Sequence, residues 1–301
     1  MRLEGKVAIV VGGGQGIGEG IVKCLAEEGA DTAVFDINAD TAKKMTDQVK
    51  AMGRKALAVV ADVTDVKQVN KSVKQTVDFF GKIDILVNVV GGASVETGRL
   101  MVEYKKTFSD QSLPGFMYDS PEIWDRYYEL NLKTHVMLCQ AVTPYFIKQR
   151  SGKIVNISST SGRIADPSQM HYASMKAADI SITWTLARAL ARYNITVNCV
   201  CPGFVYTPLW NRGAIGRLAE LREAKKKGVN LPPPFNRITD EELERLTPQD
   251  FWRNFIVIPN TPNGREQTPE DMGKAVAFFV SEDAKNITGQ VLHVDGGFVM
   301  R

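Results

Sequence analysis

The sequence predicts an α/β fold with a doubly wound parallel sheet of about seven strands. Short apolar runs alternate with helix-length amphipathic segments through the first half of the chain, and three more apolar runs follow later. Such runs are typical of strands that are buried on both faces, as in parallel sheets. Because parallel strands need crossover connections, the alternation favours right-handed βαβ units.

Glycines mark the predicted helix ends. The first strand is expected at Val7 to Val11, and the first helix runs from Ile17 to Glu28, directly before Gly29. The next two helices also end in front of a glycine, Gly53 and Gly81. Glycine readily adopts the left-handed conformation that closes a helix. The other predicted strands read, in order, DTAVFDI, ALAVVADV, KIDILVNVV, GKIVNIS, ITVNCVCPG and GQVLHVDGG.

Two long segments, at about residues 94–120 and 207–267, interrupt this alternation. Connections of such length within a compact domain are usually functional. We therefore expect one dinucleotide-binding and catalytic domain over residues 1–301, in which the two insertions form the substrate side. The basic run Lys225 to Lys227 lies in the second insertion. It indicates a solvated helix face, with a contact to an anionic substrate tail as the alternative.

Composition narrows the classes of function. The chain has 301 residues, is 44% apolar, and carries 37 basic and 34 acidic side chains for a net charge of +3. A charge this close to balance does not favour binding to nucleic acid or to an anionic membrane surface. We find no signal-peptide pattern and no apolar run of bilayer length, so a cytoplasmic protein is expected. The four cysteines and three histidines have no zinc spacing, and no metal site is predicted.

The turn after the first strand reads GGGQGIG and predicts a dinucleotide site. Gly12, Gly16 and Gly18 have the spacing G-x-x-x-G-x-G, with Gln15 and Ile17 between them. Glycines let the backbone approach a pyrophosphate, which the N–H groups of the next helix bind. The turn follows a strand and opens a helix, which is the context that such a site requires.

Asp36 lies 18 residues beyond Gly18, at the end of the second predicted strand. A carboxylate at this position can accept hydrogen bonds from the adenosine ribose hydroxyls, and it would repel a 2'-phosphate. The position therefore predicts NAD rather than NADP as the cofactor. The alternative for Asp36 is a turn residue at a strand end.

Tyr172 and Lys176, in the stretch MHYASMKAA, lie four residues apart and would share one face of a helix. A phenol has an unperturbed pKa near 10, and lowering it to about 7 takes ~4 kcal/mol. One ammonium about 4 Å away, at an effective dielectric near 20, supplies energy on the order of 4 kcal/mol. The pair therefore predicts a general acid/base, although an isolated pair of this kind is also common on protein surfaces.

Together these motifs resemble the short-chain dehydrogenase/reductase family, from Lys6 to Met300 apart from the two insertions. The resemblance implies a Rossmann fold and a catalytic tetrad of Asn131, Ser159, Tyr172 and Lys176. It also implies that Ser159 hydrogen-bonds the substrate oxygen, that Lys176 holds the nicotinamide ribose, and that Asn131 anchors a water on a proton path. The further cofactor contacts that it implies are Ile37, Asp62, Val63, Asn88, Gly91, Pro202, Gly203, Val205 and Thr207.

The chain departs from the family pattern at two places on the cofactor side. Val11 stands where the family usually has threonine, and Val89 and Val90 replace the middle of an Asn-Asn-Ala-Gly motif. Both departures bear on cofactor affinity and leave the catalytic groups intact.

We therefore expect an NAD-dependent oxidoreductase that interconverts a secondary alcohol and its ketone. Aromatic residues and methionines in the insertions favour a bulky cyclic or aromatic substrate, and their basic residues leave a hydroxyacyl thioester open. The alternatives are a catalytically silent dinucleotide-binding regulator and an epimerase or dehydratase that retains its nicotinamide. A homotetramer is expected from the resemblance and from an apolar stripe after Tyr172, formed by Met175, Ala178, Ile182, Leu186 and Leu190.

Overall fold

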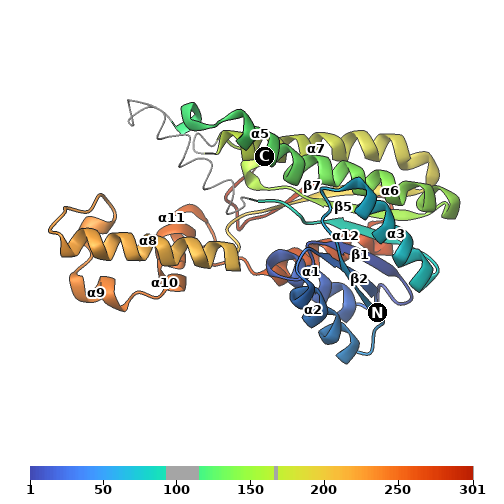
Figure 1. The fold of residues 1–301 in the computed structure, drawn as a ribbon, viewed down its shortest axis with the longest axis horizontal. Helices are drawn as coiled ribbons and strands as arrows, with labels where there is room; N and C mark the ends of the chain where they lie inside the picture. Colours follow the sequence, from blue (N-terminus) through green and yellow to red (C-terminus); the bar gives the residue numbers. More distant parts are fainter. Residues whose placement is uncertain (93–114, 166–168, 301) are drawn as a thin grey trace.

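Seven parallel strands form one sheet in the order β3-β2-β1-β4-β5-β6-β7 (Figure 1). The structure is a computed structural model that describes residues 1–92, 115–165 and 169–300. This sheet confirms the predicted α/β Rossmann fold. The strands are β1 (Val7–Val11), β2 (Asp31–Asp36), β3 (Ala56–Val60), β4 (Ile85–Asn88), β5 (Gly152–Ile157), β6 (Ile195–Pro202) and β7 (Val291–Val294).

Helices cover both faces of the sheet, as the buried apolar strands require. Ala8 and Val10 of β1 pack into the hydrophobic core beneath the first helix layer, and Ile9 and Val11 pack into the core on the opposite face. The first layer contains α1 (Gly16–Glu27), α2 (Ala39–Ala51) and α12 (Pro269–Val280). The second contains α3 (Val66–Phe80), α6 (Thr134–Gln149) and α7 (Met170–Leu190).

The glycines end helices as predicted. Gly81 caps α3 with a φ of +82°, in the left-handed region, and Gly29 and Gly53 also have positive φ angles after α1 and α2. A side chain at these positions would strain the backbone, since L-residues rarely adopt this conformation. The predicted boundaries of these three helices therefore agree with the structure to within one or two residues.

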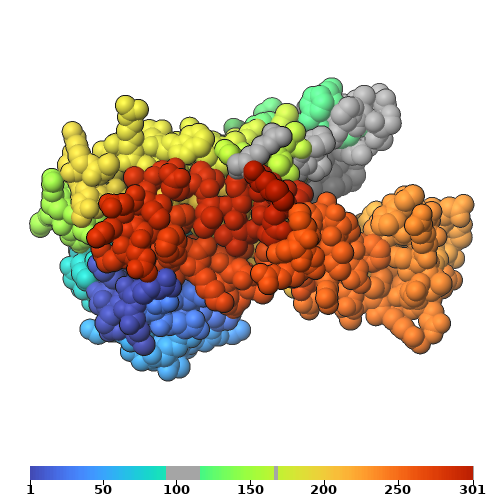
Figure 2. Space-filling model, turned by 180° about the vertical axis from the view of Figure 1, so that it is seen from behind, coloured from blue at the N-terminus to red at the C-terminus, as the bar shows by residue number. Residues whose placement is uncertain are grey.

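The second insertion forms a helical lobe, residues 208–260, which projects from the α/β body (Figures 1 and 2). The sequence predicts a long connection over this segment, whereas the structure contains several helices there. Ala214, Leu218 and Leu221 recur at helical spacing along α8, and they form a small separate core with residues from the following segments. The elements are α8 (Pro208–Lys226), α9 (Asp240–Arg245), α10 (Pro248–Trp252), a π-helical turn (Arg253–Val257) and α11 (Ile258–Asn260).

In the basic run at the end of α8, Lys226 and Lys227 are exposed, whereas Lys225 is partly buried. Each of its three lysines lies within 4.0 Å of a carboxylate of the lobe, so their charges are already paired. The pairs are Lys225 with Asp240, Lys226 with Glu244, and Lys227 with Glu223.

Most of the first insertion lies outside the described residues, including Leu100, Met101, Tyr104 and Phe108 among its apolar side chains. Its end forms a short 3₁₀ turn (Gly115–Tyr118) that leads into α5 (Pro121–Tyr128). Within the described ranges, no helix is both long and apolar enough to cross a bilayer.

Candidate active site

Asn131 lies in a π-helical turn (Glu129–Lys133) that joins α5 to α6. Its side chain is fully buried; Nδ2 donates to the carbonyl oxygen of Tyr127 at 3.2 Å, and Oδ1 accepts from the backbone N–H of Gly92 at 2.6 Å. Widened turns of this kind often occur at functional sites. Asn131 thus ties the helix junction to the loop that follows β4.

Ser159 follows β5 and begins a short 3₁₀ turn. Its Oγ accepts the backbone N–H of Ser161 at 3.1 Å. A hydroxyl that accepts one bond still has its own proton to donate. The neighbouring Ser158 donates to the backbone carbonyl of Lys176 at 2.6 Å, which fastens the serine turn to α7. Ser159 therefore keeps a hydroxyl donor in a turn that is fastened to α7.

Lys176 and Tyr172 share one face of α7. The lysine Nζ lies 6.0 Å from the centre of the Tyr172 ring. Only 1% of Lys176 is exposed, and its Nζ donates to the carbonyl oxygen of Ile157 at 3.0 Å and to Asp179 Oδ2 at 2.9 Å. An ammonium has three N–H donors, so one remains for a further acceptor.

Gly91 brings two tetrad residues together. A Cβ atom at this position would lie 2.8 Å from Asn131 Oδ1 and 3.0 Å from Lys176 Nζ, so any side chain would push both polar groups apart. The loop after β4 therefore passes directly between Asn131 and Lys176.

Asp179 lies beside Lys176, three residues further along α7, and no sequence motif predicts this contact. Burial alone would lower the pKa of Lys176, but the attraction of Asp179, reinforced by Tyr172, raises it above its ordinary value. Burial would likewise raise the pKa of Asp179, but His135 and then Lys176 lower it. The stabilisation of a Tyr172 phenolate that the sequence predicts rests on one ammonium alone. It is therefore incomplete, because the Asp179 carboxylate offsets part of that charge.

The glycine-rich turn fits a dinucleotide phosphate. Gly12 and Gly16 have φ angles of +78° and +58°, and a Cβ atom on Gly18 would lie 1.9 Å from the Gly12 carbonyl oxygen. Gln15 precedes α1 without a capping side chain, so the first N–H groups of the helix have no partner from that residue. An anionic phosphate would satisfy them.

Asp36 reaches back to this turn. Its two carboxylate oxygens accept the backbone N–H groups of Gly14 and Asn38, each at 3.0 Å. A Cβ atom on Gly14 would lie 2.6 Å from Asp36 Oδ2, so this approach requires glycine. The sequence motif does not identify Gly14, because the role of this glycine depends on a carboxylate 22 residues away.

The segment after β6 lies against the glycine-rich turn. Thr207 precedes α8, and its Cβ lies 3.5 Å from the position of a Cβ on Gly16. Val205 is buried and pairs with Gln267 in an isolated bridge. Pro202 ends β6, and Gly203 follows it. Because Thr207 lies against Gly16, the predicted nicotinamide segment and the predicted phosphate turn are neighbours.

The residues predicted to contact the adenine end of the cofactor are Ile37, Asp62 and Val63. Ile37 is 72% exposed directly after Asp36, and Val63 is buried. Asp62 Oδ1 accepts both the backbone N–H and the hydroxyl of Thr64, at 2.9 and 2.7 Å. These bonds fix the orientation of the Asp62 carboxylate at the end of β3.

The Asn88 side chain lies in the interior, at the end of β4. It is fully buried and donates to Asn156 Oδ1 at 2.9 Å. Asn156 in turn donates to the hydroxyl of Thr183 at 2.9 Å. This amide chain links β4, β5 and α7, so Asn88 supports the strands that position the site.

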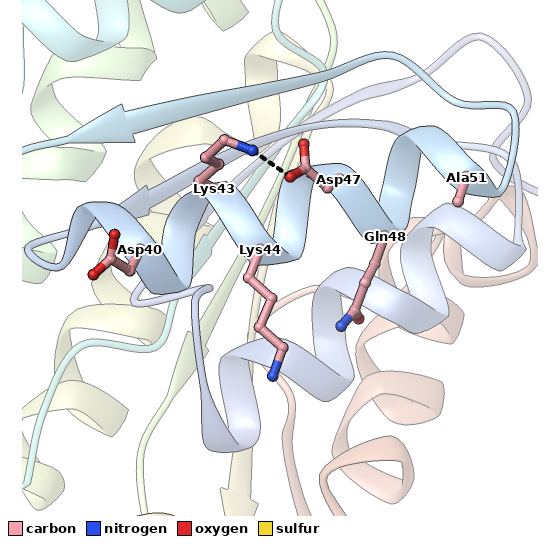
Figure 3. Close-up of a pocket in the computed structure, with 6 residues that line it drawn as sticks. All are labelled: Asp40, Lys43, Lys44, Asp47, Gln48 and Ala51. Carbon is pink, nitrogen blue, oxygen red and sulfur yellow. Dashed lines mark hydrogen bonds and ion pairs between the residues drawn. The ribbon is translucent and has the colours of Figure 1, made fainter.

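Other candidate sites carry less chemistry. The depression in Figure 3 is lined by α2 alone, and its Lys43 and Asp47 pair with one another at 2.6 Å. Among the described residues, no group of three or more histidine, cysteine, aspartate or glutamate side chains is placed to hold a metal. The four cysteines are buried free thiols, and burial raises the pKa of Cys139 to about 12.

Comparison with known proteins assigns the family. Residues 6–214 match the family model described as short chain dehydrogenase. The chain is a short-chain dehydrogenase/reductase. A second model, described as Enoyl-(Acyl carrier protein) reductase, matches residues 252–299. Residues 215–251, between the two matches, belong to the helical lobe. As a short-chain dehydrogenase/reductase, the protein is an oxidoreductase that acts on CH–OH groups with a nicotinamide dinucleotide.

The short-chain dehydrogenase/reductases that it resembles differ in substrate. The chain is 32% identical to the 3-oxoacyl-[acyl-carrier-protein] reductase FabG of Thermotoga maritima, over the full length of both. It is 30% identical to the (2S)-[(R)-hydroxy(phenyl)methyl]succinyl-CoA dehydrogenase subunit BbsD of Thauera aromatica, over 99% of this chain and 98% of that protein. A solved 7α-hydroxysteroid dehydrogenase, complexed with NADH and 7-oxo glycochenodeoxycholic acid, superposes with a TM-score of 0.74 at 29% identity, covering 100% of this chain and 96% of that one.

Proposed function

We propose that this enzyme is an NAD-dependent dehydrogenase of a bulky secondary alcohol, with Tyr172 as its general acid/base. The observation that carries the proposal is the meeting of Asn131 and Lys176 at Gly91, with Tyr172 on the same helix face as Lys176. A regulator that only binds a dinucleotide has no need of a phenol beside a buried ammonium.

The residues divide the chemistry between them. A bound nicotinamide supplies or accepts the hydride. Ser159 donates a hydrogen bond to the substrate oxygen and stabilises the charge that develops there. Tyr172 takes the alcohol proton during oxidation and returns it during reduction. Lys176 stabilises the phenolate, and its third N–H is available to a ribose hydroxyl.

An aromatic cluster supports a bulky substrate. It begins directly after Gly203, at the junction of the body and the helical lobe; the Trp210 and Trp252 rings lie 4.4 Å apart, and the Phe204 and Phe298 rings 5.0 Å apart. Trp210 is 41% exposed, and an aromatic surface of this kind favours a ring or acyl chain. The names of the three relatives also describe a steroid, an aryl-bearing CoA thioester and an acyl-carrier thioester. We infer a cyclic, aryl-bearing or 3-hydroxyacyl thioester substrate on the side of the two insertions.

A dehydrogenase panel tests this function. Cyclic alcohols, hydroxysteroids and 3-hydroxyacyl thioesters are each incubated with the enzyme and NAD⁺, and NADH is followed at 340 nm. At least one class is expected to yield NADH. If none of the three classes yields NADH, although the enzyme binds NAD⁺, the proposal is contradicted.

Cofactor choice is predicted to depend on Asp36. The wild-type enzyme should prefer NAD over NADP at least about tenfold in kcat/KM, since the carboxylate repels a 2'-phosphate. Asp36→Ala should relax this preference, whereas Asp47→Ala, an exposed carboxylate on α2, should leave it unchanged. Steady-state kinetics with both cofactors measure the ratio. Equal use of both by the wild type would refute the assignment of Asp36.

We propose a homotetramer. The apolar stripe of α7 is only half-buried within the protomer at Met175, Ala178 and Ile182, and the neighbouring Trp184 is 48% exposed. Closed symmetric assemblies commonly cover such surfaces. Light scattering at micromolar concentration should give a mass near four protomers. A monomer under these conditions would contradict the proposal.

A further inference from the structure

We propose that Asp179 and His135 are positioning residues of the active site, which form a buried ion network with Lys176 and set the net charge beside Tyr172. This inference rests on the proposed role of Tyr172 as the acid/base. It places two further residues behind the tetrad and requires a net positive charge beside Tyr172.

Three short contacts define the network. Lys176 Nζ lies 2.9 Å from Asp179 Oδ2, and the other oxygen, Asp179 Oδ1, lies 2.9 Å from His135 Nδ1. His135 Nε2 lies 2.9 Å from the carbonyl oxygen of Val90. The Asp179 and His135 side chains are fully buried, and that of Lys176 is nearly so. Solvent therefore screens these charges little.

The network connects α7, which carries Tyr172 and Lys176, to α6, which follows the turn that holds Asn131. His135 follows Asn131 by four residues, and Asp179 follows Lys176 by three, so each lies about one helical turn beyond a tetrad residue. The two partners meet between α6 and α7. Val90, which the histidine also contacts, directly precedes Gly91 in the loop between Asn131 and Lys176. Movement of any member would therefore displace the others.

The contacts of His135 favour its imidazolium form. Nε2 lies 2.9 Å from the Val90 carbonyl oxygen, and Nδ1 lies 2.9 Å from Asp179 Oδ1, although this second pair does not have the geometry of a hydrogen bond. A neutral imidazole has a single N–H, so its second nitrogen would place a lone pair within 2.9 Å of one of these oxygens. With two cations and one anion, the network carries a net charge of +1.

This count explains how Lys176 can still stabilise a phenolate. Asp179 alone would cancel most of the ammonium charge, and His135 restores it. The other polar groups facing Lys176 are Tyr172, Ser158 and the thiols of Cys199 and Cys201. A hydrogen bond with Cys201, together with burial, raises the pKa of Cys199 well above its ordinary value, so this thiol stays neutral.

The pH profile of kcat/KM for alcohol oxidation tests the network. Its acid limb reports the base of the enzyme. His135→Gln removes the compensating cation and should move the midpoint of this limb to higher pH by about one unit. Asp179→Asn removes the anion and should move it to lower pH. The double variant carries the wild-type net charge and should return the midpoint close to the wild-type value.

Thr183→Val is the matched control, because it breaks two buried hydrogen bonds on the same face of α7, with Asn156 and with the backbone carbonyl of Asp179, without changing any charge. It should lower the melting temperature and leave the midpoint in place. If Asp179→Asn does not fold, His135→Gln alone still tests the upward shift.

The outcomes separate the inference from the proposed function. Loss of activity without a shift, or shifts of both single variants in one direction, would overturn the charge network and leave only a packing role. A wild-type enzyme that forms no NADH with any alcohol of the panel would instead overturn the proposed function. The probe is the alcohol in the panel with the highest kcat/KM.

Discussion

Tyr172→Phe is expected to lower turnover at least about 100-fold, the usual scale for losing a positioned acid/base. The substitution removes the hydroxyl and keeps the ring, which packs edge-on against Tyr127 with 6.4 Å between centres. Cofactor affinity should therefore stay near the wild-type value. The measurements are kcat with NAD⁺ and the best alcohol, and the Kd for NADH by fluorescence.

Tyr193→Phe provides the control for Tyr172, because it removes a phenol hydroxyl from an exposed contact with Arg192. It should leave both kcat and Kd unchanged. Ordinary turnover by Tyr172→Phe would show that another group transfers the proton.

Lys176→Ala is expected to abolish activity, weaken cofactor binding and destabilise the fold by about 3–5 kcal/mol. The stability loss arises because the buried Asp179 would keep only His135 as a partner. Denaturant unfolding measures this loss, and steady-state kinetics measure the activity.

The double variant Lys176→Ala/Asp179→Ala separates the two roles of the lysine. Removing both charges of the pair should recover much of the lost stability, since no carboxylate that has lost one of its two partners remains next to the vacated position. Activity should not recover. A single variant as stable as the wild type would contradict the buried ion pair, and recovery of activity in the double variant would contradict the catalytic role of Lys176.

The sequence predicted the elements of the sheet well, because their signals are local. Val7–Val11 is apolar on both faces of β1, and Gly81 closes α3 at the predicted position. Both features follow from patterns within a few residues of the chain. The helical lobe was missed because its apolar positions are few and widely separated, and become a core only after α8, α9 and α10 pack together.

In the site, residues were predictable where a motif carries them and unpredictable where tertiary contacts do. Tyr172 and Lys176 are identified by their spacing, whereas Asp179 and His135 are 44 residues apart and meet only because α6 and α7 are neighbours. The position of His135, four residues after Asn131, was the one available signal. A histidine at that spacing is also compatible with ordinary helix packing, and the buried carboxylate opposite it appears only in the structure.

The central claim is that the enzyme transfers a hydride between a secondary carbinol carbon and NAD. Its most direct test uses the wild-type enzyme, NAD⁺ and the best alcohol of the panel, deuterated at the carbinol carbon, with mass spectrometry of the recovered cofactor. The account predicts that each ketone formed is matched by one molecule of NADH that carries the deuterium. Conversion of the alcohol without net NADH, as an epimerase or dehydratase that retains its nicotinamide would give, or NADH without deuterium, would contradict it.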